Sequence, residues 1–156
     1  MNRLSILVVD DRQEIRNLLR LWLESNECKV ACAEGGNEAL KLLKKGGLDL
    51  VVTDVLMPDG GGVNLIAQMR KDFSQVRILA ISGGGPRVTS PTALQMAQSV
   101  GAHALLLKPF GREQLLNAIR HLMEADLHLL ELAALTSASP RAHRERLEHR
   151  RPSTIG

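Results

Sequence analysis

The sequence of 156 residues contains few aromatic side chains: two phenylalanines, one tryptophan and no tyrosine. Its core must therefore be aliphatic, and few rings are available to stack on the bases of single-stranded nucleic acid. The sequence has no run of roughly 18 apolar residues, which argues against a membrane-spanning helix. The N-terminus also lacks the apolar segment and small-residue site of a signal peptide, so we expect a cytoplasmic protein.

Only two cysteines are present, Cys28 and Cys32. They lie four residues apart in a predicted strand, where their side chains would stand roughly 13 Å from each other, too far for a disulfide bond. No Cys-His spacing typical of a zinc site accompanies them. We therefore expect two buried, reduced thiols.

The net charge of +3 is concentrated at the C-terminus, because residues 140–156 contain five arginines and two glutamates. Subtracting these from the totals of 20 basic and 17 acidic residues leaves 15 of each in the rest of the chain. The basic tail has few apolar residues, so the sequence predicts that residues 137–156 are disordered. The tail is too short for a DNA-binding domain; it either keeps the chain soluble or binds an acidic protein or nucleic acid nonspecifically.

Polar side chains directly follow several short apolar runs of strand length. They are Asp10, Asp11, Asp54, Ser82 and Lys108. Runs this short and this rich in valine, leucine and isoleucine are typical of strands buried on both faces of a parallel sheet. Functional residues of such sheets gather beyond the carboxyl ends of the strands, so we expect these side chains to meet.

The chemistry of this set indicates phosphoryl transfer. Three carboxylates that meet at one edge repel one another and call for a hard divalent cation, Mg²⁺ by preference where phosphate is involved. One carboxylate could then attack phosphorus and become an aspartyl phosphate. A lysine ammonium and a serine hydroxyl can bind the phosphoryl oxygens.

The five residues, with Met57-Pro58 after Asp54 and Pro109 after Lys108, resemble the receiver domain of two-component response regulators. The resemblance covers residues 3 to 123, and we expect a receiver domain over residues 1–123. It implies a flavodoxin-like α/β fold, in which helices cover both faces of a doubly wound, five-stranded parallel sheet.

By this resemblance each candidate residue has a role in a phosphorylation switch. Asp54 is the phosphoacceptor, Ser82 is the switch hydroxyl and Lys108 pairs with the phosphoryl group. The implied ligands of Mg²⁺ are Asp10, Asp11, Asp54 and the backbone carbonyl of Leu56. The implied phosphodonor is a phosphohistidine on a histidine kinase or a histidine phosphotransfer protein.

Output is expected by protein–protein binding, because no second domain follows in this sequence. The resemblance implies a downstream target on the face formed by the fourth helix, the fifth strand and the fifth helix. Catalysis would be limited to the chain's own phosphorylation and dephosphorylation, so the protein is not expected to be an enzyme.

Two features depart from the usual receiver pattern. Leu105 stands three residues before Lys108, where many receivers have an aromatic switch residue. If this weakens switching, the protein is a constitutive receiver-like scaffold. The loop over residues 83–91 is also longer than usual and rich in glycine, either as a tolerated insertion or as a segment ordered by the phosphoryl group.

A phosphatase of the haloacid-dehalogenase type is a further alternative, because it also forms an aspartyl phosphate with Mg²⁺. Such enzymes need an Asp-x-Asp motif, whereas Asp10 and Asp11 are adjacent and the residue two after Asp54 is Leu56. The sequence therefore disfavours turnover of outside substrates.

Apolar residues at helical spacing predict helices between the strands. We expect Trp22 in the core, Asn37 as the N-cap of a helix over residues 38–45, and His103 as an ordinary loop residue. The last helix starts near Arg112 and stays apolar beyond the receiver domain. We expect its extension over residues 124–136 either to fold back on the domain or to pair with another copy, which would give a homodimer.

Overall fold

The computed structural model describes residues 3–58, 61–83 and 90–137. The chain divides into two compact units, residues 1–122 and residues 123–156. The described part of the second unit, residues 123–137, is helical. Most of the long glycine-rich loop and all of the basic tail from residue 138 lie outside the described residues. No described helix is both long and apolar enough to cross a membrane.

A single parallel sheet of five strands forms the centre of the first unit, in the order β2-β1-β3-β4-β5. The strands are β1 (Ser5–Val9), β2 (Lys29–Ala33), β3 (Leu50–Asp54), β4 (Arg77–Ser82) and β5 (Ala104–Leu107). This all-parallel sheet confirms the predicted α/β class, and β2 lies at an edge as its more polar sequence predicts.

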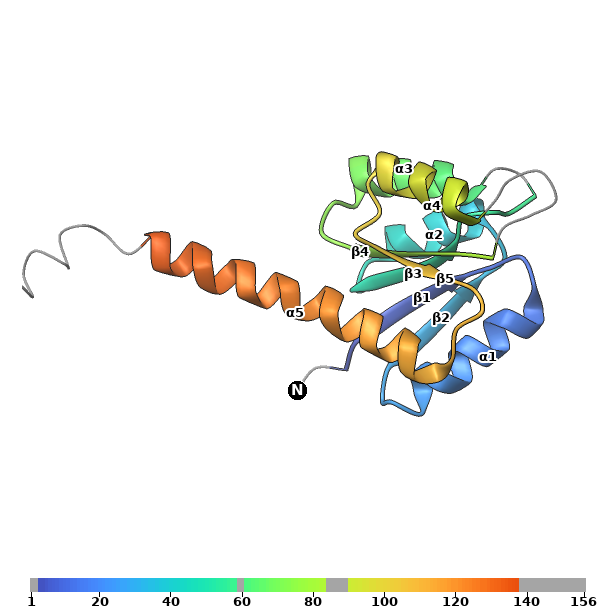
Figure 1. Ribbon diagram of the computed structural model, residues 1–156, viewed down its shortest axis with the longest axis horizontal. Coiled ribbons are helices and arrows are strands. Elements are labelled where there is room, and N and C mark those ends of the chain that lie inside the picture. The colour runs from blue at the N-terminus through green and yellow to red at the C-terminus, as the bar shows by residue number, and fades with distance from the viewer. Residues whose placement is uncertain (1–2, 59–60, 84–89, 138–156) are drawn as a thin grey trace, which may run out of the picture. The chain divides into compact units, whose positions relative to one another are not determined.

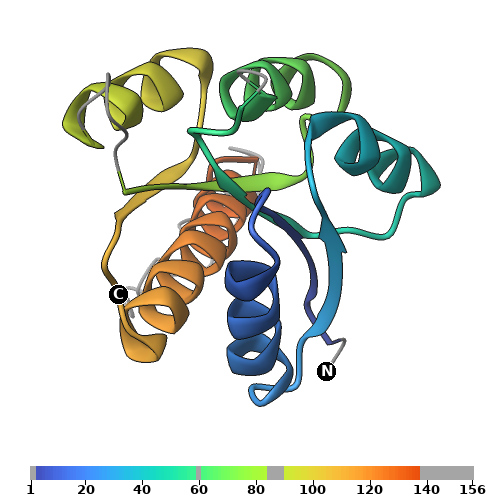
Figure 2. The same ribbon diagram turned by 90° about the vertical axis from the view of Figure 1, so that its right-hand side faces the viewer.

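The helices connect successive strands and cover both faces of the sheet (Figures 1 and 2). They are α1 (Gln13–Glu24), α2 (Gly36–Lys45), α3 (Gly61–Asp72), α4 (Ser90–Val100) and α5 (Arg112–Ser137). In Figure 2, α1 and the first turns of α5 lie on one face, whereas α2, α3 and α4 lie on the other. This double cover explains why every residue of β3 is buried, without the alternation of a sheet that faces water.

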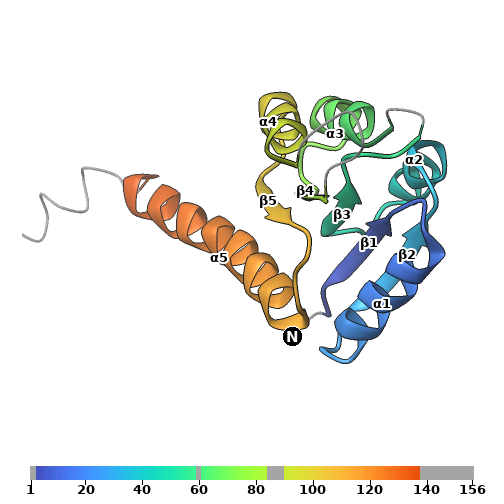
Figure 3. The ribbon, with the colours of Figure 1, turned by 45° about the vertical axis from the view of Figure 1, so that its right-hand side comes forward.

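The register of the strands brings the candidate residues to one edge. Val9 of β1 lies opposite Thr53 of β3, so Asp10 follows beside Asp54. At the other side of β3, Asp54 lies opposite Ile81 of β4, and Ser82 lies opposite the last residue of β5. Because all strands run in the same direction (Figure 3), their carboxyl ends form one continuous site.

Three local predictions were wrong in detail. Helix α2 begins at Gly36 with Gly35 as its N-cap, so Asn37 lies inside the helix. The reason is Glu38, whose carboxylate accepts a hydrogen bond from the backbone N–H of Glu34 and fixes the earlier start. Trp22 is half-buried rather than in the core, and its ring meets that of Phe110 edge to face at 6.4 Å between centroids. Both cysteines are free, but half-buried.

His103 is more than a loop residue. Its Nδ1 accepts a hydrogen bond of 3.0 Å from the backbone N–H of Ile78, at the start of β4. The backbone N–H of His103 in turn donates to the carbonyl of Ile78 at 3.0 Å. The imidazole therefore extends the pairing between β4 and the segment before β5 by one residue, and its Nε2 lies 2.8 Å from Nη1 of Arg70.

Candidate functional site

Three carboxylates form the base of the site at the ends of β1 and β3. Asp10 and Asp54 are buried, with 2% and 6% of their surfaces exposed, whereas Asp11 is exposed. One carboxylate oxygen from each lies within 4.8 Å of the other two. Oxygen donors of this kind and number suit a hard divalent cation such as Mg²⁺, so the residues present fit the predicted ion.

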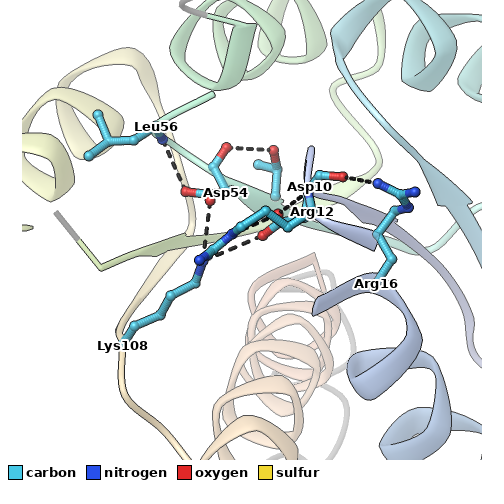
Figure 4. A network of polar contacts seen from close by, with 7 residues as sticks. Asp10, Arg12, Arg16, Asp54, Leu56 and Lys108 are labelled. Carbon is cyan, nitrogen blue, oxygen red and sulfur yellow. Dashed lines mark hydrogen bonds and ion pairs between the residues drawn. The ribbon is translucent and has the colours of Figure 1, made fainter. Parts of the chain in front are cut away.

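Lys108 brings a positive charge to the same point from the end of β5. Its Nζ lies 3.2 Å from Oδ2 of Asp54 and 3.4 Å from Oδ2 of Asp10, as Figure 4 shows. The backbone N–H of Lys108 donates to the carbonyl of Ser82 at 3.0 Å, which fixes the start of this side chain to β4. The Lys108–Pro109 peptide bond is cis.

The environment of Asp54 raises the pKa of its carboxyl group above the ordinary value of 3.8. The largest cause is burial, which removes water from the charged form. The ammonium of Lys108 acts against this shift, and the repulsion of Asp10 adds to it. The backbone N–H of Leu56 donates to Oδ1 of Asp54 at 3.0 Å and also favours the charged form.

A cavity of about 420 Å³ gives access to the Asp54 carboxylate. It is lined by Asp11, Arg12, Asp54, Leu56, Gly83, Lys108 and Pro109. The geometry therefore combines the buried carboxylate of Asp54, two further carboxylates and an ammonium with a space that a phosphoryl group could enter.

Ser82 and Leu56 lie where the sequence predicts. Ser82 is fully buried as the last residue of β4, beside Lys108. Leu56 lines the cavity and bonds to Asp54 through its N–H. The roles of the Ser82 hydroxyl and of the Leu56 carbonyl as a metal ligand remain predictions.

Two arginines of this region were missed by sequence reasoning. Arg12 lines the cavity; its backbone N–H donates to Oδ1 of Asp10 at 2.9 Å, and its Nε lies 3.7 Å from the same oxygen. Arg16 is only 12% exposed, and its Nη1 donates to the backbone carbonyl of Asp10 at 2.8 Å. It also forms an ion pair with Glu34 at 3.7 Å, so it holds the end of β1 toward the segment after β2.

Gly62, the second residue of α3, occupies a position where only glycine fits. A Cβ atom at this position would overlap the backbone of Asp54 and Val55. Only glycine therefore allows the first turn of α3 to pack directly against the end of β3, which carries Asp54. The neighbouring Gly61 has ordinary space around it.

A family model described as the response regulator receiver domain matches residues 6–120 of the chain. Among curated proteins, the chain is 34% identical over 117 residues to the CAI-1 autoinducer sensor kinase/phosphatase CqsS of Vibrio cholerae. That alignment covers 73% of this chain but only 16% of CqsS. The chain spans about half the length of the next two curated relatives.

Solved structures show the same fold. The chemotaxis response regulator CheY4 of Vibrio cholerae is 30% identical with a TM-score of 0.70, and the match covers 78% of this chain and 99% of CheY4. The response regulator TrrA of Thermotoga maritima, solved in complex with Mg²⁺-BeF, is 29% identical with a TM-score of 0.67. Here the match covers 76% of this chain and 98% of TrrA.

Proposed function

Because the chain belongs to the family of response regulator receiver domains, we propose that it is a signalling switch whose Asp54 accepts a phosphoryl group from a phosphohistidine. The observation that carries this proposal is the environment of Asp54. Its carboxylate is buried at the end of β3, within 4.8 Å of the carboxylates of Asp10 and Asp11 and 3.2 Å from the ammonium of Lys108. A structural salt bridge between Lys108 and Asp54 would not need two further carboxylates close to the Asp54 carboxylate.

In the proposed transfer, a carboxylate oxygen of Asp54 forms a bond to phosphorus while the phosphorus–nitrogen bond of the phosphohistidine breaks. The electron pair of that bond goes to the ring nitrogen, and the imidazole, which carries a proton on its other nitrogen, leaves as the neutral ring. Lys108 stays close to the transferring oxygens and offsets their charge. Mg²⁺ held by Asp10, Asp11, Asp54 and the Leu56 carbonyl would supply further positive charge to this group.

An apolar cavity next to the site supports a protein as the phosphodonor. It has a volume of about 240 Å³ and is lined mainly by side chains of α1 and by Pro109 and Phe110. Arg12, Lys108 and Pro109 line both this cavity and the one that holds Asp54. A helix that carries a phosphohistidine could therefore place apolar side chains beside α1 while the phosphoryl group reaches Asp54. We expect this partner to be a histidine kinase or a histidine phosphotransfer protein.

Output by protein binding is supported by the surface of α4, β5 and α5. Met96 of α4 and Leu107 of β5 are each 47% exposed, although both are large apolar side chains. The phosphorylated Asp54 would draw the Ser82 hydroxyl toward the new oxygens and so shift this surface toward a form that a downstream protein prefers. If the surface instead pairs two copies of the chain, phosphorylation will change the sedimentation of the protein alone.

A constitutive scaffold is the second candidate, and Leu105 favours it. This residue lies opposite Ala80 in the sheet and packs against the core as a partly buried aliphatic side chain. It has no polar edge with which to follow the movement of Ser82. A scaffold would accept the phosphoryl group without any change in partner affinity.

The test is incubation with a small phosphodonor and Mg²⁺, followed by intact mass. The wild type should gain one phosphoryl group, Asp54→Ala should gain none, and the exposed control Asp72→Ala should behave as the wild type. Labelling of the Asp54→Ala variant would refute the assignment of the phosphoacceptor. Steady release of phosphate from a phosphate ester would instead support the phosphatase alternative.

A further inference from the structure

Arg12 lies at the site but has no role in the transfer step proposed above. Its side chain is 53% exposed, lies directly before α1 and forms part of the wall of the cavity that holds Asp54. Its Nε pairs with Oδ1 of Asp10, whereas Lys108 pairs with Oδ2 of the same carboxylate. The two cations therefore pair with different oxygens of Asp10. Both line the cavity that holds Asp54, and Figure 4 shows their side chains beside Asp10.

Among the residues that the structure describes, nothing occupies the two terminal nitrogens of the Arg12 guanidinium. Within residues 3–58, 61–83 and 90–137 the partner of this side chain is Asp10, through Nε, and no described residue pairs with Nη1 or Nη2. A guanidinium presents these donors as a planar fork that matches the oxygens of a phosphoryl group.

Arg12 determines whether the total charge of the site is positive or zero once a divalent cation is bound. The side chains of Asp10, Asp11 and Asp54 contribute three negative charges, and Lys108 and Arg12 contribute two positive ones. With a divalent cation among the carboxylates, the total is a single positive charge. Without Arg12 the same total is zero, so only the wild type would attract an anionic donor over a distance.

We propose that Arg12 binds the phosphodonor: its guanidinium holds oxygens of the anionic phosphoryl group at the entrance before transfer to Asp54. This inference rests on the proposed function of Asp54 and adds a substrate-binding residue to it. The alternative is a purely structural role, in which Arg12 only fixes the start of α1 through its contact with Asp10.

These two roles predict opposite changes in the affinity for Mg²⁺ when Arg12 is replaced. If Arg12 only supports the fold of the site, its replacement disturbs Asp10 and weakens both Mg²⁺ and the donor. If it binds the donor, its replacement weakens the donor but removes a positive charge from beside the carboxylates. The affinity for Mg²⁺ should then rise by about threefold, the effect of one partly exposed charge pair.

The experiment compares the full chain with Arg12→Gln, Arg12→Lys and the control Arg20→Gln, a half-exposed arginine of α1 that pairs with Glu24. Rates of labelling with acetyl phosphate at saturating Mg²⁺ give the half-saturating donor concentration, and calorimetry gives the affinity for Mg²⁺. We expect Arg12→Gln to raise the half-saturating concentration about tenfold, the contribution of one charge-assisted hydrogen bond. Arg12→Lys should restore most of this loss, and Arg20→Gln should match the wild type.

Three results would overturn the role of Arg12. One is an unchanged half-saturating concentration in Arg12→Gln, and another is an Arg12→Lys variant as poor as Arg12→Gln. The third is a parallel loss of Mg²⁺ affinity. Failure of the proposed function is distinguishable from all of these, because then the wild type itself would not be labelled on Asp54.

Discussion

Replacing the proposed phosphoacceptor should make the fold more stable. In Asp54→Asn the side chain keeps its shape, and its Oδ1 can still accept the N–H of Leu56. Lys108 keeps a partner, because it also pairs with Asp10 at 3.4 Å. The substitution therefore removes one buried negative charge and little else.

The magnitude follows from the distances around Asp54. At an effective dielectric constant of about 20, its attraction to Lys108 across 3.2 Å is worth about 5 kcal/mol. Its repulsion by each of Asp10 and Asp11, within 4.8 Å, is worth about 3.5 kcal/mol. Solvent weakens the repulsion between Asp54 and the exposed Asp11, which reduces the stability gained in the variant. The variant also no longer buries a charge, which increases the gain. We expect Asp54→Asn to raise the free energy of unfolding by about 2 kcal/mol at pH 7.

The gain in the free energy of unfolding of Asp54→Asn over the wild type should depend on pH in a defined direction. Because the pKa of Asp54 is raised in the fold, the folded wild type binds a proton more tightly than the unfolded chain does. The wild type therefore loses stability relative to the variant as the pH rises from about 4 through the raised pKa. Below pH 3 the carboxyl group is protonated in both states, and the difference between the two proteins should disappear.

Mg²⁺ should reduce or reverse the difference at neutral pH. A ligand at ten times its dissociation constant stabilises the protein that binds it by about 1.4 kcal/mol. Asp54→Asn lacks one of the three carboxylates and should gain less from the ion.

The assay is urea unfolding in EDTA and in Mg²⁺, between pH 3 and pH 7, followed by far-UV circular dichroism. The matched control is Asp72→Asn, an exposed carboxylate at the end of α3, which should leave stability unchanged. A variant that is no more stable than the wild type at pH 7 in EDTA would refute the reasoning. So would a gain that persists at pH 3, since it could not come from the charge.

Further substitutions test other contacts of the site. Lys108→Met should lower the free energy of unfolding by about 2 kcal/mol at pH 7 in EDTA, because two buried carboxylates lose their cation; the loss should shrink at acidic pH as Asp54 takes up its proton. Gly62→Ala should cost about 3 kcal/mol in urea unfolding, because its Cβ would overlap the backbone at the end of β3, whereas Gly61→Ala should cost little. His103→Leu should cost about 1 to 2 kcal/mol and speed hydrogen exchange of the β4 N–H that loses its acceptor, and unchanged exchange at that amide would contradict the assigned hydrogen bond.

The fold was predictable because its signals are local. Strands β1, β3, β4 and β5 each contain an unbroken apolar run, which is typical of a parallel sheet covered on both faces, whereas the edge strand β2 is more polar. The helices have apolar residues at helical spacing. The polar residues that end the runs could be placed together without knowing any side-chain contact, because parallel strands share one carboxyl edge. The first residue of α2 was harder to predict from the sequence, because it depends on whether the Glu38 carboxylate reaches back to the backbone N–H of Glu34.

What the sequence could not provide are roles that arise from contacts between distant segments. Arg12, Arg16 and Arg20 look alike in the sequence, because they are spaced four residues apart from the N-cap of α1 into its second half. Only the fold separates them: Arg12 enters the wall of the site, Arg16 is buried against the carbonyl of Asp10, and Arg20 faces outward. The role predicted for Asp54 follows from the residue types at the strand ends, whereas the pairing of Arg12 with Asp10 at the wall of the site is visible only in the fold. If Arg12 binds the phosphodonor as proposed, variants of this chain that differ only at this position should differ in donor affinity, which makes it the position to vary when donor preference is studied.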